Sequence, residues 1–270
     1  MFEFWMAILV AVAGWWFFTG LILWSVHVVK GRQPFIFALA TLLFLVGLFL
    51  VPSISALNSV TGVVLSFTLA IVLWGWLEMA YLMNIITGVH HMPCPKNATL
   101  TSRFRLGLGT CLYHELGVVF TGALIVSLAE AGAMSVIFWT YSTLWMMRWS
   151  AKLNLVLGVR NYNRDWLPSD LQYVDSYIRR KPMNGLFPLS LVVAVAVTVW
   201  VFLLSLDPRP IPEQIGLTLV ATLLALGVLE HLFLMLPLGE GRLWGWASPA
   251  EEPLAQHPAD PLHSGLPSQT

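Results

Sequence analysis

The chain has 270 residues, of which 57% are hydrophobic and only 10% are charged, and its mean hydropathy is +0.76. These values exclude an ordinary soluble domain and indicate a polytopic membrane protein. Lys and Arg balance Asp and Glu, so the formal net charge is zero. Such a balance gives no sign of a nucleic-acid partner, and we expect none.

Apolar stretches of the length that crosses a membrane recur along the chain. A hydrocarbon core requires about 20 residues of helix. The stretches cover residues 4–29, 34–52, 60–87, 105–130, 134–157, 184–205 and 214–236. The sequence therefore predicts an all-α bundle of seven transmembrane helices, which occupies residues 1–238.

The distribution of basic residues predicts the orientation of this bundle. Lys and Arg are enriched in loops and helix ends on the cytoplasmic side. If the N-terminus lies outside, every Lys and Arg except Arg209 falls on the cytoplasmic side. We therefore predict a multi-pass protein with its N-terminus outside and its C-terminus in the cytoplasm.

Two segments are expected to lie outside the bundle. In the loop 158–183, the apolar residues Leu171, Val174 and Ile178 recur at helical spacing, which predicts a short amphipathic helix on the cytoplasmic membrane surface. The tail 239–270 contains repeated prolines and few large apolar residues. Its composition is typical of a disordered cytoplasmic segment.

Ionisable residues inside the apolar helices are the strongest indication of function. Such groups are costly at membrane depth and are retained for pairing, binding or transport. The candidates for a binding pocket are Glu78, His114, Glu115, Glu230 and His231. Arg148 and Lys152 lie one helical turn apart and, together with Asn154, are expected to act as counter-charges.

Residue spacing predicts which helix faces meet around these groups. Gly107, Thr110, His114, Gly117 and Thr121 form one stripe of small and polar residues if the segment 105–130 is a continuous helix. Small residues allow helices to approach closely, so the stripe should face the bundle. We therefore expect a polar pocket near the cytoplasm, formed by four of the predicted helices: 60–87, 105–130, 134–157 and 214–236.

The residues themselves leave two interpretations of this pocket open. In the first, the carboxylates and cations pair to specify packing, with His114 and His231 as hydrogen-bond partners. In the second, His114 or His231 is an axial ligand to a metal or to the magnesium of a bacteriochlorophyll-type macrocycle. The tryptophans, including Trp15, Trp16, Trp244 and Trp246, are expected to lie mostly in the interfacial belts of the membrane.

Several uncommon runs of residues also resemble a known family. They are WGWLEM at 74–79, CP at 94–95, LYHEL at 112–116, LWMMRWSAKLN at 144–154, LGVRN at 157–161 and KPMN at 181–184. In this order they resemble the PuhE family, the putative photosynthetic complex assembly protein 2 of anoxygenic phototrophic bacteria. The matching polar residues are Glu78, His114, Glu115, Arg148, Lys152 and Asn154.

The resemblance implies a non-enzymatic factor in a bacterial inner membrane. Such a factor would assist the assembly of photosynthetic reaction-centre and light-harvesting complexes and modulate the supply of bacteriochlorophyll. We expect the pocket to bind bacteriochlorophyll or a precursor. The expected partners are photosynthetic subunits or pigment-synthesis enzymes, contacted through Arg179, Arg180 and Lys181. The alternatives are a membrane metalloprotein or enzyme acting on a tetrapyrrole or quinone, and a proton-coupled carrier.

Overall fold

The computed structural model describes residues 2–29, 31–129, 136–236 and 240–247, and within these ranges all regular structure is helical. The helices are α1 (Phe2–His27), α2 (Gln33–Ser55), α3 (Val60–Leu82), α4 (Leu100–Gly109), α5 (Leu112–Leu128), α6 (Val136–Leu157), α7 (Leu186–Leu206) and α8 (Ile211–Phe233), with short 3-10 helices η1 (Arg164–Trp166), η2 (Ser169–Tyr177) and η3 (Glu240–Ala247). The all-α prediction is therefore confirmed for the described residues.

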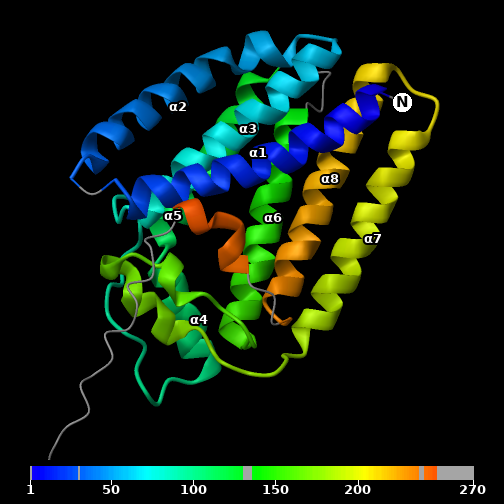
Figure 1. Ribbon diagram of the computed structural model, residues 1–270. Helices are drawn as coiled ribbons and strands as arrows, with labels where there is room; N and C mark the ends of the chain where they lie inside the picture. The colour runs from blue at the N-terminus through cyan, green and yellow to red at the C-terminus, as the bar shows by residue number, and fades with distance from the viewer. Residues whose placement is uncertain (1, 30, 130–135, 237–239, 248–270) are drawn as a thin grey trace, which may run out of the picture.

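The long helices pack side by side into a bundle (Figure 1). α2 and α7 lie at its two edges, α3, α6 and α8 lie between them, and α1 crosses the face of α3 and α8. α3 is the central element, with Leu73 and Leu77 in its fully buried core face. Its N-terminus is fixed because the Ser59 hydroxyl accepts a hydrogen bond of 3.1 Å from the Gly62 N–H.

The described part of the chain contains five helices long and apolar enough to cross a membrane, namely α1, α2, α3, α7 and α8. The count rises to six if α4 and α5 together make one span. α6 carries Arg148 and Lys152 and is too polar to count by composition, although it packs against α3 and α8. The chain is thus a multi-pass membrane protein by composition, whereas the seven spans and their orientation stay predictions.

The prediction of one continuous helix over 105–130 was wrong. α4 and α5 meet at an angle of 64°. The Thr110 hydroxyl donates back to the Gly107 carbonyl at 2.7 Å, and the backbone N–H groups of His90 and His114 bond to Gly109 and Thr87. The helix breaks because the loop 83–99 offers its backbone these alternative partners. The expected stripe is therefore divided, and Gly107 lies against Tyr177 rather than among the helices.

The loop 158–183 also differs from its prediction. It forms η1 and η2 instead of one amphipathic α-helix, and Leu171 is completely buried against Tyr81, Cys111 and Leu167. A bridge between Val159 and Arg180 closes the segment on itself. The loop therefore covers the end of the bundle. We call this end, which also carries the loop 83–99, the loop end.

The start of the predicted disordered tail is ordered as well. Residues 240–247 form η3, which packs on α1 with Trp244 and Ala247 buried beside Leu23. The Trp244 indole donates to the Trp16 carbonyl, and the Trp16 indole donates to the Leu243 carbonyl, both at 2.9 Å. The predicted boundary at residue 239 is therefore too early, and residues 248–270 lie outside the described ranges.

Candidate binding cavity

A cavity of about 410 Å³ lies inside the loop end of the bundle. Its walls come from α1, α3, α4, α6 and α8, and η1, η2 and η3 contribute Trp166, Val174, Tyr177 and Trp244. The volume falls within the range of about 300–1,000 Å³ that is typical of small-molecule sites. Most of the lining is apolar or aromatic, with Glu78, Arg148, Lys152 and Glu230 as the charged residues in the wall.

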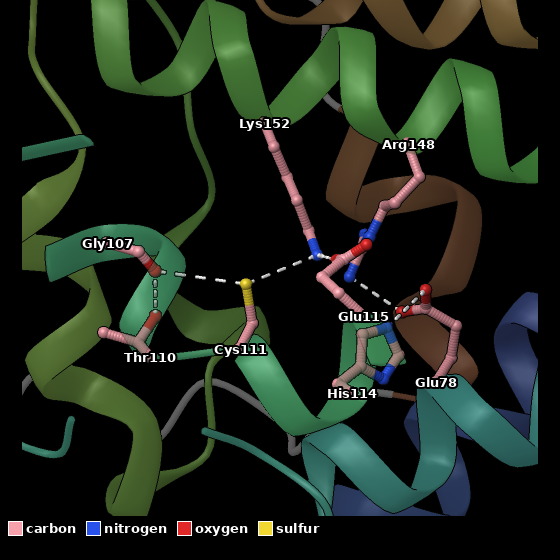
Figure 2. A network of polar contacts seen from close by, with 8 residues as sticks. All are labelled: Glu78, Gly107, Thr110, Cys111, His114, Glu115, Arg148 and Lys152. Atoms are coloured by element: carbon pink, nitrogen blue, oxygen red, sulfur yellow. Dashed lines mark hydrogen bonds and ion pairs between the residues drawn. The ribbon is translucent and has the colours of Figure 1, made fainter. Parts of the chain in front are cut away.

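Two ion pairs join α6 to the neighbouring helices (Figure 2). The guanidinium of Arg148 donates to Oε2 of Glu78 on α3 at 2.7 Å, and the ammonium of Lys152 donates to Oε1 of Glu115 on α5. Arg148 and Lys152 thus each pair with one carboxylate. Since both carboxylates are nearly buried and each has its own cation, these pairs fix the packing of three helices.

Lys152 makes two further contacts at the cavity wall. Its Nζ lies 3.8 Å from Sγ of Cys111 and 5.9 Å from the centroid of the Tyr81 ring. Cys111 precedes α5 at the break after α4, so this break carries its thiol into reach of Lys152 (Figure 2). The lysine therefore holds together α3, α5 and α6 through one ammonium group.

His114 lies behind the cavity wall rather than in it. Its side chain is almost fully buried, and its Nε2 is 3.9 Å from Oε1 of Glu78, too long for a hydrogen bond. Neither ring nitrogen makes a hydrogen bond to the residues that the structure describes, and the ring lies 5.1 Å from that of Tyr81. His114 therefore lies beside Glu78 and Glu115 but does not reach the cavity. Tyr81 and Glu78 form the cavity wall in front of it.

Glu230 is the carboxylate of the cavity wall that interacts with Arg148 electrostatically without forming a direct ion pair among the described residues. Its Oε1 accepts a hydrogen bond of 2.6 Å from the Trp15 indole of α1, and no ion pair involves it among the described residues. Because it lines the cavity, its surface is accessible although it lies within the bundle. Glu230 is thus separate from the two ion pairs of α6.

His231 does not face the cavity, contrary to the predicted pocket. Its Nδ1 bonds to the Gly227 carbonyl and its Nε2 to the Ser150 hydroxyl, both at 2.8 Å. Both ring nitrogens are therefore occupied, and the residue links α8 to α6. Glu230 and His231 are adjacent on α8 and their side chains point in different directions, that of Glu230 toward the cavity and that of His231 toward Ser150 of α6.

Asn154, which was expected to act as a counter-charge, makes neutral hydrogen bonds that link helices. Its neutral amide donates to Ser150 O at 2.9 Å and to Ser190 Oγ at 3.1 Å, and Asn184 donates to its Oδ1 at 3.1 Å. A neutral amide adds no charge to the cluster. Asn154 and Asn184 instead tie α6 to the start of α7.

The three basic residues predicted to contact a partner differ in their surroundings. Arg180 is engaged within the loop, bonding to Asp175 at 3.3 Å and to the Tyr162 carbonyl at 3.2 Å. Lys181 is exposed and Arg179 is half-buried, and no ion pair involves either of them among the described residues. Two of the three side chains are thus available at the surface of the loop end.

The prediction from the sequence missed the contribution of α1 and of the tryptophans. α1 supplies Trp15, Phe18, Thr19 and Ile22 to the wall, whereas α5 supplies nothing beyond the preceding Cys111. Trp15, Trp244 and Trp166 form a chain of rings, with centroids 5.2 Å and 5.6 Å apart. The helical spacing of Trp15, Thr19 and Ile22 was the available signal, but interfacial tryptophans give the same pattern.

Metal ligation receives no support from the geometry. In the residues that the structure describes, no three His, Cys, Asp or Glu side chains come together as a metal site. The predicted axial histidines do not fit either, because His114 and His231 are both absent from the cavity wall.

Comparison with known proteins supplies the family. Residues 1–255 match a family model described as "Protein of unknown function (DUF3623)". The chain belongs to the DUF3623 family. Within this family, it is 36% identical over 267 residues to the "Uncharacterized 30.4 kDa protein in puhA 5'region" of Rhodobacter capsulatus, and the match covers 97% of each chain. No solved structure matches the chain. The assignment to PuhE from the sequence runs stays a prediction.

Proposed function

We propose that the protein assists the assembly of photosynthetic reaction-centre and light-harvesting complexes by holding bacteriochlorophyll or a precursor in its cavity. The observation that carries the proposal is the cavity itself, which joins broad aromatic walls to a few charged groups inside a membrane bundle. Flat aromatic ligands stack favourably on such walls. A relative named for its position 5' of puhA is compatible with a photosynthetic role.

The protein would supply binding and orientation, and the pigment would supply its own light absorption. Trp15, Trp166 and Trp244 would contact the face or edge of the ring. The Arg148 guanidinium, which lines the cavity, would donate a hydrogen bond to a carboxylate or carbonyl of the ligand. No catalytic step is required of these residues, which favours a binding role over an enzyme.

A cavity-filling substitution tests this proposal. Gly75 lines the cavity, and a Cβ there would meet only Ile22 at 3.6 Å, so Gly75→Leu should occupy ligand space. Gly185→Leu is the control, because Gly185 does not line the cavity and a Cβ there would meet nothing within 4 Å. The protein would be purified from a pigment-producing cell and its absorption spectrum recorded.

Pigment should copurify with the wild type and with the Gly185→Leu variant and be lost from the Gly75→Leu variant. Absence of pigment from the folded wild-type protein would contradict the proposal. Equal pigment content in both variants would show that any bound pigment lies elsewhere.

We also propose that the loop end contacts an assembly partner. Arg179 and Lys181 present basic groups there, while Arg180 stabilises the loop and should be left unchanged. Replacing both Arg179 and Lys181 by Glu should lower the yield of assembled complex without removing the protein from the membrane. Arg209→Glu, in the short segment between α7 and α8, is the control. Unchanged assembly in the double variant would contradict a partner contact through these two residues.

A further inference from the structure

The loop 83–99 exposes an apolar surface at the loop end of the bundle. Its large apolar side chains Ile85, Val89 and Met92 are each more than half exposed. The loop directly follows α3, whose 23 residues suffice to cross a hydrocarbon core of about 30 Å. If α3 crosses the core, the loop begins where the core ends. Exposed apolar side chains at that depth meet the lipid interface.

Only basic charges accompany this apolar surface. The segment 83–109 contains Lys96, Arg103 and Arg105 and no Asp or Glu. The Arg103 guanidinium donates to the Ser176 carbonyl of η2 at 2.6 Å. Lys96 and Arg105 are exposed, and neither makes an ion pair with the residues that the structure describes. Two available cations beside apolar side chains complement a surface of anionic lipid headgroups.

Hydrogen bonds hold the loop in one conformation against α4 and η2. The His90 N–H donates to the Gly109 carbonyl at 3.1 Å, and the Tyr177 hydroxyl donates to the Met92 carbonyl at 2.8 Å. The apolar side chains are therefore presented by a backbone that is already fixed. Contact with lipid would not have to order the loop first, which lowers the entropic cost of binding.

The bend between α4 and α5 fits a helix that lies along the membrane surface. α5 has 17 residues, at the lower end of the range that crosses a bilayer, so it can span without α4. α4 departs from the axis of α5 by 64°, and none of its residues is buried. If α5 runs along the membrane normal, α4 lies closer to the membrane plane than to the normal.

We propose that the loop 83–99 and α4 form a membrane anchor that binds anionic phospholipid headgroups. The exposed apolar side chains of the loop enter the interface, and Lys96 and Arg105 contact the headgroup phosphates. The sequence predicted a membrane-surface helix in 158–183, but that segment packs over the end of the bundle. The inference goes beyond the proposed function, because it uses neither the cavity nor its ligand.

Spin-label depth measurements test the apolar part of the anchor. Full-length Cys94→Ser protein, in which the remaining Cys111 is buried, would carry a nitroxide at Val89→Cys or Met92→Cys in nanodiscs containing phosphatidylglycerol. Both labels should be relaxed more by oxygen, which concentrates in lipid, than by an aqueous nickel chelate. Asn97→Cys, exposed in the same loop, is the control and should show the reverse. Stronger relaxation by the nickel chelate at positions 89 and 92 would overturn the anchor.

Lipid selection tests the basic part. The detergent-solubilised full-length protein would be incubated with equal amounts of phosphatidylglycerol and phosphatidylcholine, and retained lipid measured by native mass spectrometry. The wild type should prefer phosphatidylglycerol, and Lys96→Glu combined with Arg105→Glu should lower this preference about tenfold. Arg209→Glu, in the segment between α7 and α8, should behave as the wild type. An unchanged preference in the double variant would overturn the headgroup contact.

Discussion

Gly88 and Gly109 meet backbone to backbone at the break between α4 and α5: a Cβ built at Gly88 would lie 2.1 Å from the Gly109 carbonyl oxygen. It would also lie 2.7 Å from the Cys111 backbone nitrogen, so no side-chain rotation can relieve the clash. This close approach holds the loop 83–99 against the break that brings Cys111 to the cavity wall.

Gly88→Ala should therefore destabilise the protein, because backbone atoms at the break must move apart. We expect a loss of at least about 1–3 kcal/mol, as for an overpacked core, and a lower Tm in detergent. Gly185→Ala is the control, since a Cβ there would meet nothing within 4 Å. Equal Tm values for the two variants would contradict the observed contact.

The ion pair between Glu115 and Lys152 should show strong energetic coupling. Lys152→Met leaves a nearly buried carboxylate without its cation and should cost roughly 3 kcal/mol of stability. Adding Glu115→Gln removes that carboxylate charge, so the double variant should be more stable than Lys152→Met alone. Thermal unfolding of the four proteins measures the coupling, and simple additivity would show that the pair contributes nothing.

The bond between His231 and Ser150 should affect stability without affecting ligand binding. Ser150→Ala leaves one buried ring nitrogen of His231 unpaired and should lower stability by about 1–3 kcal/mol. Neither residue lines the cavity, so the pigment content of the folded variant should equal that of the wild type. A selective loss of binding would instead support the histidine ligand predicted from the sequence.

Gly20 controls the docking of η3 on α1. A Cβ at Gly20 would lie 2.2 Å from a ring carbon of Trp246 and 2.9 Å from one of Trp244, so Gly20→Ala should displace η3. Hydrogen exchange of residues 243–247 should become faster, whereas Gly14→Ala, with no contact closer than 3.7 Å, should leave it unchanged. Unchanged exchange in Gly20→Ala would mean that η3 is held by other contacts.

Much of the fold could be predicted, because the long apolar stretches of the sequence coincide with helices of the structure. The predicted stretch 60–87 contains α3, and 134–157 nearly coincides with α6. The ion-paired roles of Arg148 and Lys152 were also predictable, since buried charges require partners. These conclusions depend on local sequence and on pairing rules that act over short distances.

The rest depended on contacts that periodicity does not encode. The prediction of which helix faces meet depended on an unbroken helix through Thr110, and the break is caused by backbone partners from the loop 83–99. It also treated Glu230 and His231 as one site, although adjacent helical residues point apart. Trp15 and Trp244 could not be distinguished from interfacial residues, because their role arises from the meeting of α1 with η3.

The docking of η3 on α1 brings the first and the last helix of the described residues together at one wall of the cavity. During translation α1 emerges well before η3, so this wall is incomplete until synthesis has passed residue 247. The other walls, which are complete with α8, can therefore form before this one closes. A ligand that enters at that stage would need no opening motion of η3.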